Sequence, residues 1–406
     1  MPKVRVAEPT IVRRRPRDRK EQIAKASADA FSALGYHAVS MDEIASRVGI
    51  SAAALYRHSP SKYDLFRDAV LSLGQQLVDC TEDIGIGDDP AGALDALIGA
   101  IVDTSIANRN SGGLYRWEGR YLNDADQRLL MDQIKVVNRK LQQPLSTLRP
   151  ELTSHERWTL SSAALSVIGS VADHHSSLPL GAMRSLLCDL ATAVLGAVFP
   201  TASQDPTPRP TVDSLTSLAM SGEAGKYEAL LHESLILFHK NGFRETSMED
   251  IAGAVGMPAS GIYRYFTSKG DMLAASYRRA ADRVSGDLAS VLNSETDPRR
   301  ALVRLVEAYV ARSFRDPEIA YVYYTEQTNL PETDQVILRN IQRSTAESWA
   351  RLLVATRPEL NQVQAKFAVH AAFALVVDIG RLVQYDDTPY SQACVRLMME
   401  RVLFGA

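Results

Sequence analysis

Few residues in this 406-residue chain have types and spacings that could support catalysis or hold a metal ion. The His-Glu-x-x-His motif of metalloproteases, the Gly-x-Ser-x-Gly motif of serine hydrolases and the Walker lysine of phosphate-binding loops are all absent. His174 and His175 are adjacent, and neighbouring side chains on a helix point about 100° apart, so the pair makes a poor metal site. We therefore expect neither an enzyme nor a metal or cofactor.

Charge distribution is more informative than total charge. The net charge is −3, yet residues 1–20 carry eight Lys or Arg side chains against two carboxylates. The three cysteines lie far apart, which suits a reducing cytoplasm and gives no disulfide framework. Neither a secretory signal nor an uninterrupted apolar run of about 18 residues is present, so we expect a cytoplasmic protein without a membrane partner.

The chain contains a tandem repeat. A shift of 207 positions aligns Phe31 with Phe238 and continues without a gap for 34 positions. A shift of 208 then aligns Arg-Pro-Glu-Leu at 149–152 with the same four residues at 357–360. Because the matches keep their order and spacing, the sequence indicates a duplicated unit of about 200 residues.

Both copies show helical periodicity, and the segment between them is rich in Pro, Ser and Thr. Apolar residues recur at helical spacing, whereas alternating strand patterns are scarce, so we predict an all-α fold. The composition of residues 200–225 predicts a linker.

A helix-turn-helix pattern occurs once in each copy. In the first, Ser40 can cap a short helix, a turn containing Gly49 follows, and Ser51 can cap a second helix that ends at His58. In the second copy Ser247 is the first cap, and the second helix is predicted over 258–266. In such motifs the second helix enters the DNA major groove.

These segments resemble the N-terminal domain of TetR-type repressors over about 50 residues in each copy. The shared motif is Ser-x-x-x-Ile-Ala-x-x-x-Gly, followed by Leu-Tyr-Arg-His at 55–58 in the first copy and by Ile-Tyr-Arg-Tyr-Phe at 262–266 in the second. The tandem layout is similar to that of single-chain double-TetR regulators of actinobacteria, some of which control lipid-import and lipid-degradation operons.

The resemblance implies a DNA-binding role for three sets of residues. Arg57 and Arg264 would bind guanine edges, while alanines of the same helices can touch only thymine methyl groups. The implied base-reading set is Ala52, Ala53, Arg57, Ala259, Ser260 and Arg264. The implied phosphate-binding set is Ser40, Tyr56, His58, Lys62, Ser247, Tyr263, Tyr265 and Lys269. Arg13, Arg14 and Arg15 resemble arms that enter a narrow minor groove.

The copies depart from the family pattern in different ways. The first has Ser59-Pro60 where the second keeps Phe266, so we expect the first recognition helix to be set at a slightly different angle. The second copy lacks the basic arm, and residues 226–271 carry five Lys or Arg against six Asp or Glu. Because phosphate neutralisation supplies most non-specific affinity, the first copy should bind DNA more strongly.

The resemblance also divides the chain and implies an effector cavity in each copy. The predicted parts are a basic arm (1–18), a DNA-binding domain (19–72), an effector domain (73–199), the linker (200–225), a second DNA-binding domain (226–276) and a second effector domain (277–406). The candidate cavity residues are Trp117, Glu118, Tyr121, Tyr324 and Glu326. An aromatic core with a satisfied carboxylate explains each of them equally well. The kinship favours a lipid-like or otherwise apolar effector.

Family members normally dimerise through their last two helices, which here correspond to 155–176 with 182–198 and to 361–384 with 390–404. We expect these segments to pair within one chain, giving an intramolecular pseudo-dimer on an asymmetric operator, most often as a repressor. The alternatives are a homodimer with four readers, or an interaction scaffold in which one helix-turn-helix has lost DNA binding.

Overall fold

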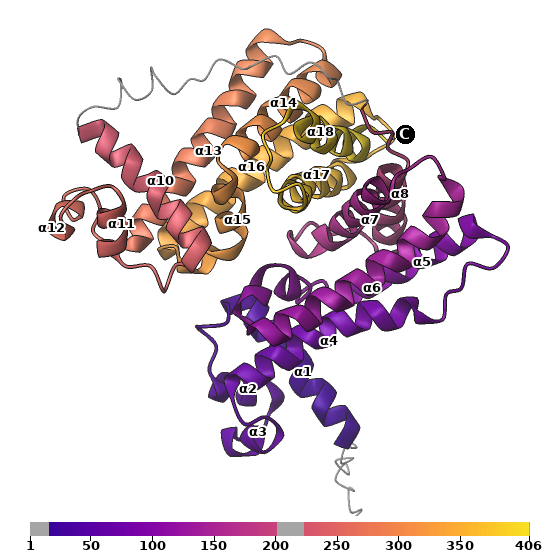
Figure 1. Cartoon of the computed structure of the whole chain (residues 1–406), viewed down its shortest axis with the longest axis horizontal. Coiled ribbons are helices and arrows are strands. Elements are labelled where there is room, and N and C mark those ends of the chain that lie inside the picture. The colour runs from indigo at the N-terminus through magenta and orange to yellow at the C-terminus, as the bar shows by residue number, and fades with distance from the viewer. Residues whose placement is uncertain (1–15, 201–222, 406) are drawn as a thin grey trace, which may run out of the picture. The chain divides into compact units, whose positions relative to one another are not determined.

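The computed structural model describes residues 16–200 and 223–405, and every regular element in these ranges is helical (Figure 1). The all-α prediction is confirmed. The chain divides into two compact units, one formed by residues 1–76 and 110–132 and the other by residues 77–109 and 133–406.

The first unit contains the first helix-turn-helix. Its helices are α1 (Pro16–Leu34), α2 (Met41–Val48), α3 (Ala52–His58) and the first part of α4 (Lys62–Glu82). Ser40 accepts a hydrogen bond from the Glu43 amide and Ser51 one from the Ala54 amide, so both predicted N-caps form. Gly49 ends α2 with a φ of 70°, a left-handed conformation that favours glycine.

Residues 110–132 complete the core of the first unit. They contain the short turns η1 (Leu114–Glu118) and η2 (Gly119–Tyr121) and the start of α6 (Asp124–Leu148). Leu114 and Leu122 join Phe31 and Leu55 in one buried apolar cluster. This segment is therefore part of the same packed body as α1–α4.

The second unit repeats this arrangement further along the chain. The helices equivalent to α1–α4 are α10 (Glu223–Asn241), α11 (Met248–Ala254), α12 (Ala259–Ile262) and the start of α13 (Lys269–Ser294). They are followed by α14 (Pro298–Arg315), α15 (Pro317–Thr325), η4 (Gln327–Asn329) and α16 (Glu332–Thr356). Phe238, Ile251 and Ile262 are fully buried and form one cluster with Val322 of α15. The core of copy two is thus built like that of copy one.

The remaining helices of the second unit come from both halves of the sequence. They are α5 (Pro90–Ala107), α7 (Ser154–Gly169), η3 (Ser170–Ala172), α8 (Leu180–Leu195), α17 (Gln362–Leu382) and α18 (Pro389–Phe404). Helix α7 packs against α17, and α8 packs against α18. The Ser166 hydroxyl donates to Asp378 Oδ2 across the α7–α17 contact at 2.6 Å.

Two helices of the described ranges, α5 and α17, are long and apolar enough to span a membrane. Of α17, 72% is buried inside the protein, which is the state of a core helix, whereas α5 is 39% buried. Length and composition alone are weak evidence for a membrane span, and the packing of α17 accounts for its apolar character.

Candidate nucleic-acid interface and effector cavity

Helix α3 has one buried side and one solvent-facing side. Leu55 is fully buried in the core of the first unit, while Tyr56, Arg57 and His58 are exposed. Ala53 is exposed as well, and Ala52 is half-buried. Apart from Ala52, which packs against the core, the predicted base-reading and phosphate-binding side chains of this helix therefore lie on the face that the core leaves free, as a groove-binding helix requires.

The second reader is shorter than we expected. We predicted a helix over 258–266, but α12 ends at Ile262 and the chain continues through turns. The amides of Arg264 and Tyr265 bond to the carbonyls of Gly261 and Ile262, respectively. Tyr263 and Arg264 are exposed, as are the predicted base-reading residues Ala259 and Ser260, and Tyr265 is half-buried. Arg264 thus projects from a turn, whereas Arg57 projects from a helix.

The aromatic residue that distinguishes the copies has a defined partner. Phe266 is buried and its ring stacks on Tyr227 of α10 with the centroids 5.0 Å apart. At the same spacing copy one has Lys20 and Ser59, and Ser59 is also buried. Because the stacked pair exists in only one copy, the two readers are held by different packing, which supports the predicted difference in angle.

The two lysines predicted to bind phosphate have partners within the protein. Lys269 Nζ donates to the carbonyls of Phe243, Arg244 and Thr246, at 2.6, 3.1 and 2.5 Å. Lys62 Nζ donates to the His37 carbonyl at 3.3 Å. An ammonium group has three N–H donors, so a phosphate contact by Lys269 would require it to give up one of these bonds. Phosphate binding by these lysines stays a prediction.

The serines in the phosphate set act as helix caps. Ser247 Oγ accepts from the Asp250 amide at 3.0 Å, and Asp250 accepts in return from the Ser247 amide. Ser40 plays the same part for α2 and is exposed. Both serines mark helix N-termini, where backbone amides favour anions. Arg13, Arg14 and Arg15 lie outside the described residues.

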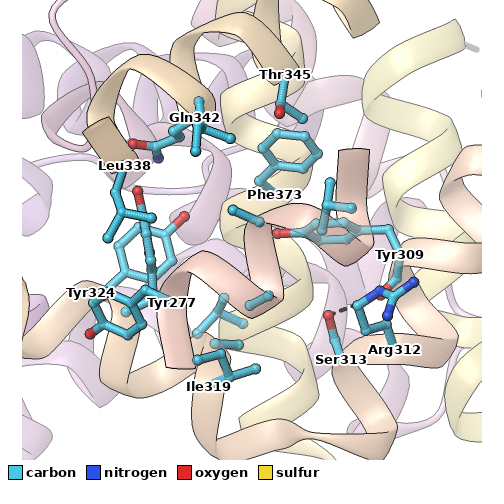
Figure 2. Close-up of a pocket in the computed structure, with 17 residues that line it drawn as sticks. Tyr277, Tyr309, Arg312, Ser313, Ile319, Tyr324, Leu338, Gln342, Thr345 and Phe373 are labelled. Carbon is cyan, nitrogen blue, oxygen red and sulfur yellow. Dashed lines mark hydrogen bonds between the residues drawn. The ribbon is translucent and has the colours of Figure 1, made fainter. Parts of the chain in front are cut away.

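A cavity of about 150 Å³ lies among α13, α14, α15, α16 and α17 of the second unit (Figure 2). Its wall is largely aromatic and aliphatic, with Tyr277, Tyr309, Tyr324 and Phe373 among its residues. Burial raises the pKa of Tyr309 to about 12, so this phenol is neutral at physiological pH. A neutral, apolar wall of this kind suits an apolar ligand.

Arg312 is the cationic residue on the cavity wall. Its Nη2 forms an ion pair with Asp287, while its Nε is buried without a hydrogen-bond partner. A buried donor without a partner is costly, and a ligand oxygen could satisfy it. The cavity therefore combines a largely apolar wall with a guanidinium donor, Arg312 Nε, that no described residue satisfies.

The predicted cavity residues divide between two places. Tyr324 lies on the cavity wall, but Glu326, contrary to our expectation, does not line it. Glu326 is fully buried and accepts a hydrogen bond from the Phe243 amide at 3.3 Å. Its carboxylate is satisfied within the protein, as the alternative interpretation of the sequence allowed.

The three candidates of copy one lie in the first unit. Glu118 accepts from the Tyr36 amide at 3.2 Å, and the Tyr121 ring stacks on Tyr36. Trp117 is buried, with the Arg116 guanidinium over its ring. These contacts join residues 110–132 to the DNA-binding helices, and effector binding by the three residues stays a prediction.

Sequence reasoning missed Tyr277, Tyr309 and Arg312 of the cavity. They occur within amphipathic helices, where the sequence alone does not distinguish the wall of a cavity from a packed core. The position of Arg312 within the apolar stripe of α14 was the available signal, because a buried cation requires a partner.

A polar cluster lies where η3 and the segment that follows it meet α17. The His174 ring stacks on His370 with centroids 4.4 Å apart, and Arg109 donates to the carbonyls of Val171, His174 and Ser176. Burial lowers the pKa of His174, and lowers that of His370 to about 4. Among the described residues, no group of three His, Cys, Asp or Glu side chains could hold a metal ion.

Comparisons with known proteins agree on one family. The model for bacterial regulatory proteins of the tetR family matches residues 23–69 and again 230–276. The HTH-type transcriptional repressor KstR2 of Rhodococcus jostii (strain RHA1) is 29% identical over 151 residues, which cover 37% of this chain and 71% of that protein. The HTH-type transcriptional activator FasR of Mycolicibacterium smegmatis is 48% identical over 54 residues, covering 13% of this chain and 25% of that protein.

Among solved structures, a TetR-family transcriptional regulator from Bordetella parapertussis 12822 aligns with a TM-score of 0.41 and 21% identity, over 44% of this chain and 94% of that one. Both matches to the family model coincide with the two helix-turn-helix segments described above. The chain therefore belongs to the TetR family of bacterial DNA-binding transcriptional regulators and carries the family's DNA-binding domain twice in tandem.

Proposed function

We propose that this chain regulates transcription as an intramolecular pseudo-dimer, with its two DNA-binding domains on the two half-sites of one operator. The observation that carries the proposal is the packing of α7 on α17 and of α8 on α18, because these are the helix pairs that family members use to dimerise. A linker keeps the two halves at a high effective concentration, which favours pairing within the chain. In this proposal each half consists of a DNA-binding domain, at 19–72 and 226–276, followed by an effector domain, at 73–199 and 277–406.

The two half-sites are proposed to differ in sequence. Arg57 reads one from a helix and Arg264 reads the other from a turn, with different side chains around each. The basic arm with Arg13, Arg14 and Arg15 adds phosphate and minor-groove contacts to the first half-site only. The operator is therefore asymmetric, and the first half-site contributes most of the affinity.

An apolar small molecule is proposed to fill the cavity and to release the DNA. The aromatic walls provide its main contacts, and an oxygen on the ligand would accept from Arg312 Nε. One relative is named a repressor and another an activator. The longer match is to the repressor, so we propose repression in the absence of ligand, in the cytoplasm on the nucleoid.

The test is a titration of the full chain against DNA from its own upstream intergenic region, beside scrambled DNA of the same composition. The mass of the complex at saturation is read in the same experiment. Specific binding by one chain per site supports both the regulator and the pseudo-dimer. Binding by two chains per site would support the role as a regulator but would show that the active form is a homodimer with four readers.

The second candidate function is an interaction scaffold in which one helix-turn-helix has lost DNA binding. It is favoured by one observation, the four-residue length of α12. A DNA reader loses affinity steeply as salt rises, with a slope that counts the neutralised phosphates. Weak binding that does not distinguish the two DNAs and depends little on salt would favour the scaffold.

A further inference from the structure

The loop that joins the first two helices of each DNA-binding domain is held from two sides. In copy two, this loop spans residues 242–247, between α10 and α11. Glu326 accepts from the Phe243 amide on one side, and Lys269 donates to the Phe243 and Thr246 carbonyls on the other. The Lys269 ammonium also lies over the Phe243 ring, 4.8 Å from its centroid.

Copy one has the same arrangement. Glu118 Oε2 accepts from the Tyr36 amide at 3.2 Å, and Lys62 Nζ donates to the His37 carbonyl. Lys62 lies 4.7 Å from the centroid of the Tyr36 ring. The two glutamates are 208 positions apart and the two lysines 207, so both copies keep a glutamate on a loop amide and a lysine on a loop carbonyl. We call this contact the loop clamp.

In copy two, both members of the loop clamp are joined to the cavity. Glu326 directly follows α15, whose Tyr323 and Tyr324 line the cavity. Lys269 is the first residue of α13, whose Tyr277 lines the cavity and bonds to the Val322 carbonyl of α15. A displacement of either helix by a ligand would therefore pull on the loop.

The Glu326 side of the clamp is the more rigid one. Its side chain is fully buried, and its second oxygen accepts from Asn329 Nδ2 at 2.6 Å. A buried carboxylate held by two donors has one geometry, and the Phe243 amide must follow it or lose its hydrogen bond. The Lys269 side chain, by contrast, is long and rotates about several bonds.

We propose that Glu326 is a positioning residue that couples occupancy of the cavity to the orientation of the second DNA-binding domain through the Phe243 amide. Glu118 holds the Tyr36 amide in the same way in the first domain. This inference rests on the proposed function, because it assigns a coupling role between the proposed effector site and the proposed DNA reader. In this role Glu326 accepts a hydrogen bond from the loop and does not contact the ligand.

The test is a double-mutant cycle in the full chain, with a cavity-filling substitution in place of the unidentified ligand. Thr345→Phe fills the cavity from α16, whose side of the cavity is remote from the loop clamp in sequence. Glu326→Gln keeps an oxygen acceptor at the same reach, whereas Glu326→Asp keeps the charge but is one methylene too short. Glu332→Ala, an exposed carboxylate of α16, is the matched control.

We expect Thr345→Phe to change the operator Kd about fivefold or more in the wild-type, Glu326→Gln and Glu332→Ala backgrounds, a typical size for a coupling between two sites. In the Glu326→Asp background the same change should fall below about twofold. Equal effects in all backgrounds, an effect lost with Gln but kept with Asp, or no effect in the wild type would overturn the proposal.

Hydrogen exchange at the Phe243 amide provides a readout that needs no DNA. We expect protection to fall in Glu326→Asp and to be retained in Glu326→Gln, and unchanged protection in both would overturn the positioning role. Should the wild type bind no DNA specifically, the proposed function fails while this measurement still decides what Glu326 holds. The two failures are therefore distinguishable.

Discussion

At the scale of the residue, the DNA-binding surface depends on which side chains the core leaves exposed. Leu55 fixes the orientation of α3 by its complete burial, and this turns Arg57 and Tyr56 towards solvent. The sequence predicted this division, because Leu55 is the one large aliphatic side chain of α3, whereas Tyr56, Arg57 and His58 carry polar groups. It did not predict that Lys62 and Lys269 bind carbonyl groups. A lysine after a capping serine is equally compatible with binding a phosphate and with binding backbone carbonyls.

Replacing Arg57 with alanine should relax sequence preference. A bidentate contact between arginine and guanine contributes about 1–3 kcal/mol of discrimination against the wrong base. We therefore expect the affinity of the operator to fall while binding to scrambled DNA changes little. Titration of both DNAs at one salt concentration measures this, with Arg184→Ala, an exposed arginine of α8, as the control. An equal loss on both DNAs would make Arg57 a phosphate ligand.

Replacing Lys269 with methionine should destabilise the protein before it affects DNA. Three backbone carbonyls would lose their donor, and each half-buried bond of this kind contributes about 0.5–1.5 kcal/mol. Lys269 is half-buried, and this burial lowers the pKa of its ammonium group. Urea unfolding is the measurement. If stability were unchanged and binding to every DNA were weaker, Lys269 would be a phosphate ligand instead.

At the scale of the element, the two readers differ more than the motif suggested. The cap and turn signals located α2, α3 and α11 correctly, because Ser caps and a left-handed glycine act locally. The length of α12 could not be predicted in the same way. The chain leaves α12 at Ile262, and four residues later Phe266 packs against Tyr227, 39 positions earlier in the chain; tertiary contacts of this kind override local helix propensity.

Phe266→Ala should therefore loosen the second reader alone. Removing a buried phenylalanine costs about 3–5 kcal/mol, and here the loss falls on the contact between α10 and the turn that carries Arg264. Hydrogen exchange should rise across α10–α12 and remain unchanged across α1–α3. Tyr263→Ala, which removes an exposed ring, is the control. A uniform rise in both copies would show that the two readers unfold together.

At the scale of the whole molecule, the contact between α7 and α17 is not symmetric. By the repeat shift of 208, Ser166 corresponds to Ala374, and Asp378 corresponds to Ser170. The hydrogen bond between Ser166 and Asp378 therefore has no equivalent between Ala374 and Ser170. Pairing the second half with a copy of itself would place Asp378 opposite an alanine, without the serine donor. This favours pairing of unlike halves, because the half-buried Asp378 carboxylate would lose the hydrogen bond that Ser166 donates.

The pair of stacked histidines makes the same contact sensitive to acid. His174 and His370 have pKa values lowered by burial and by nearby positive groups, among them Arg109, Lys366 and His175. A histidine with a folded-state pKa below its unfolded value of about 6.5 binds protons mainly when the contact opens. The free energy of unfolding is therefore highest, as far as this histidine is concerned, above about pH 6.5. It decreases as the pH falls towards 4.

His370→Phe should make stability less dependent on pH in that range. The ring can still stack on His174, and no described hydrogen bond of the His370 side chain is lost. Since one unit of pKa difference corresponds to about 1.4 kcal/mol, and the pKa of His370 is lowered to about 4, we expect the variant to lose about 2–3 kcal/mol less than the wild type between pH 6.5 and 4. Urea unfolding at several pH values measures this, with the exposed His155→Gln as the control. Parallel curves for all three proteins would mean that protonation of His370 does not oppose the α7–α17 contact, and that the acid response of the chain arises from its carboxylates instead.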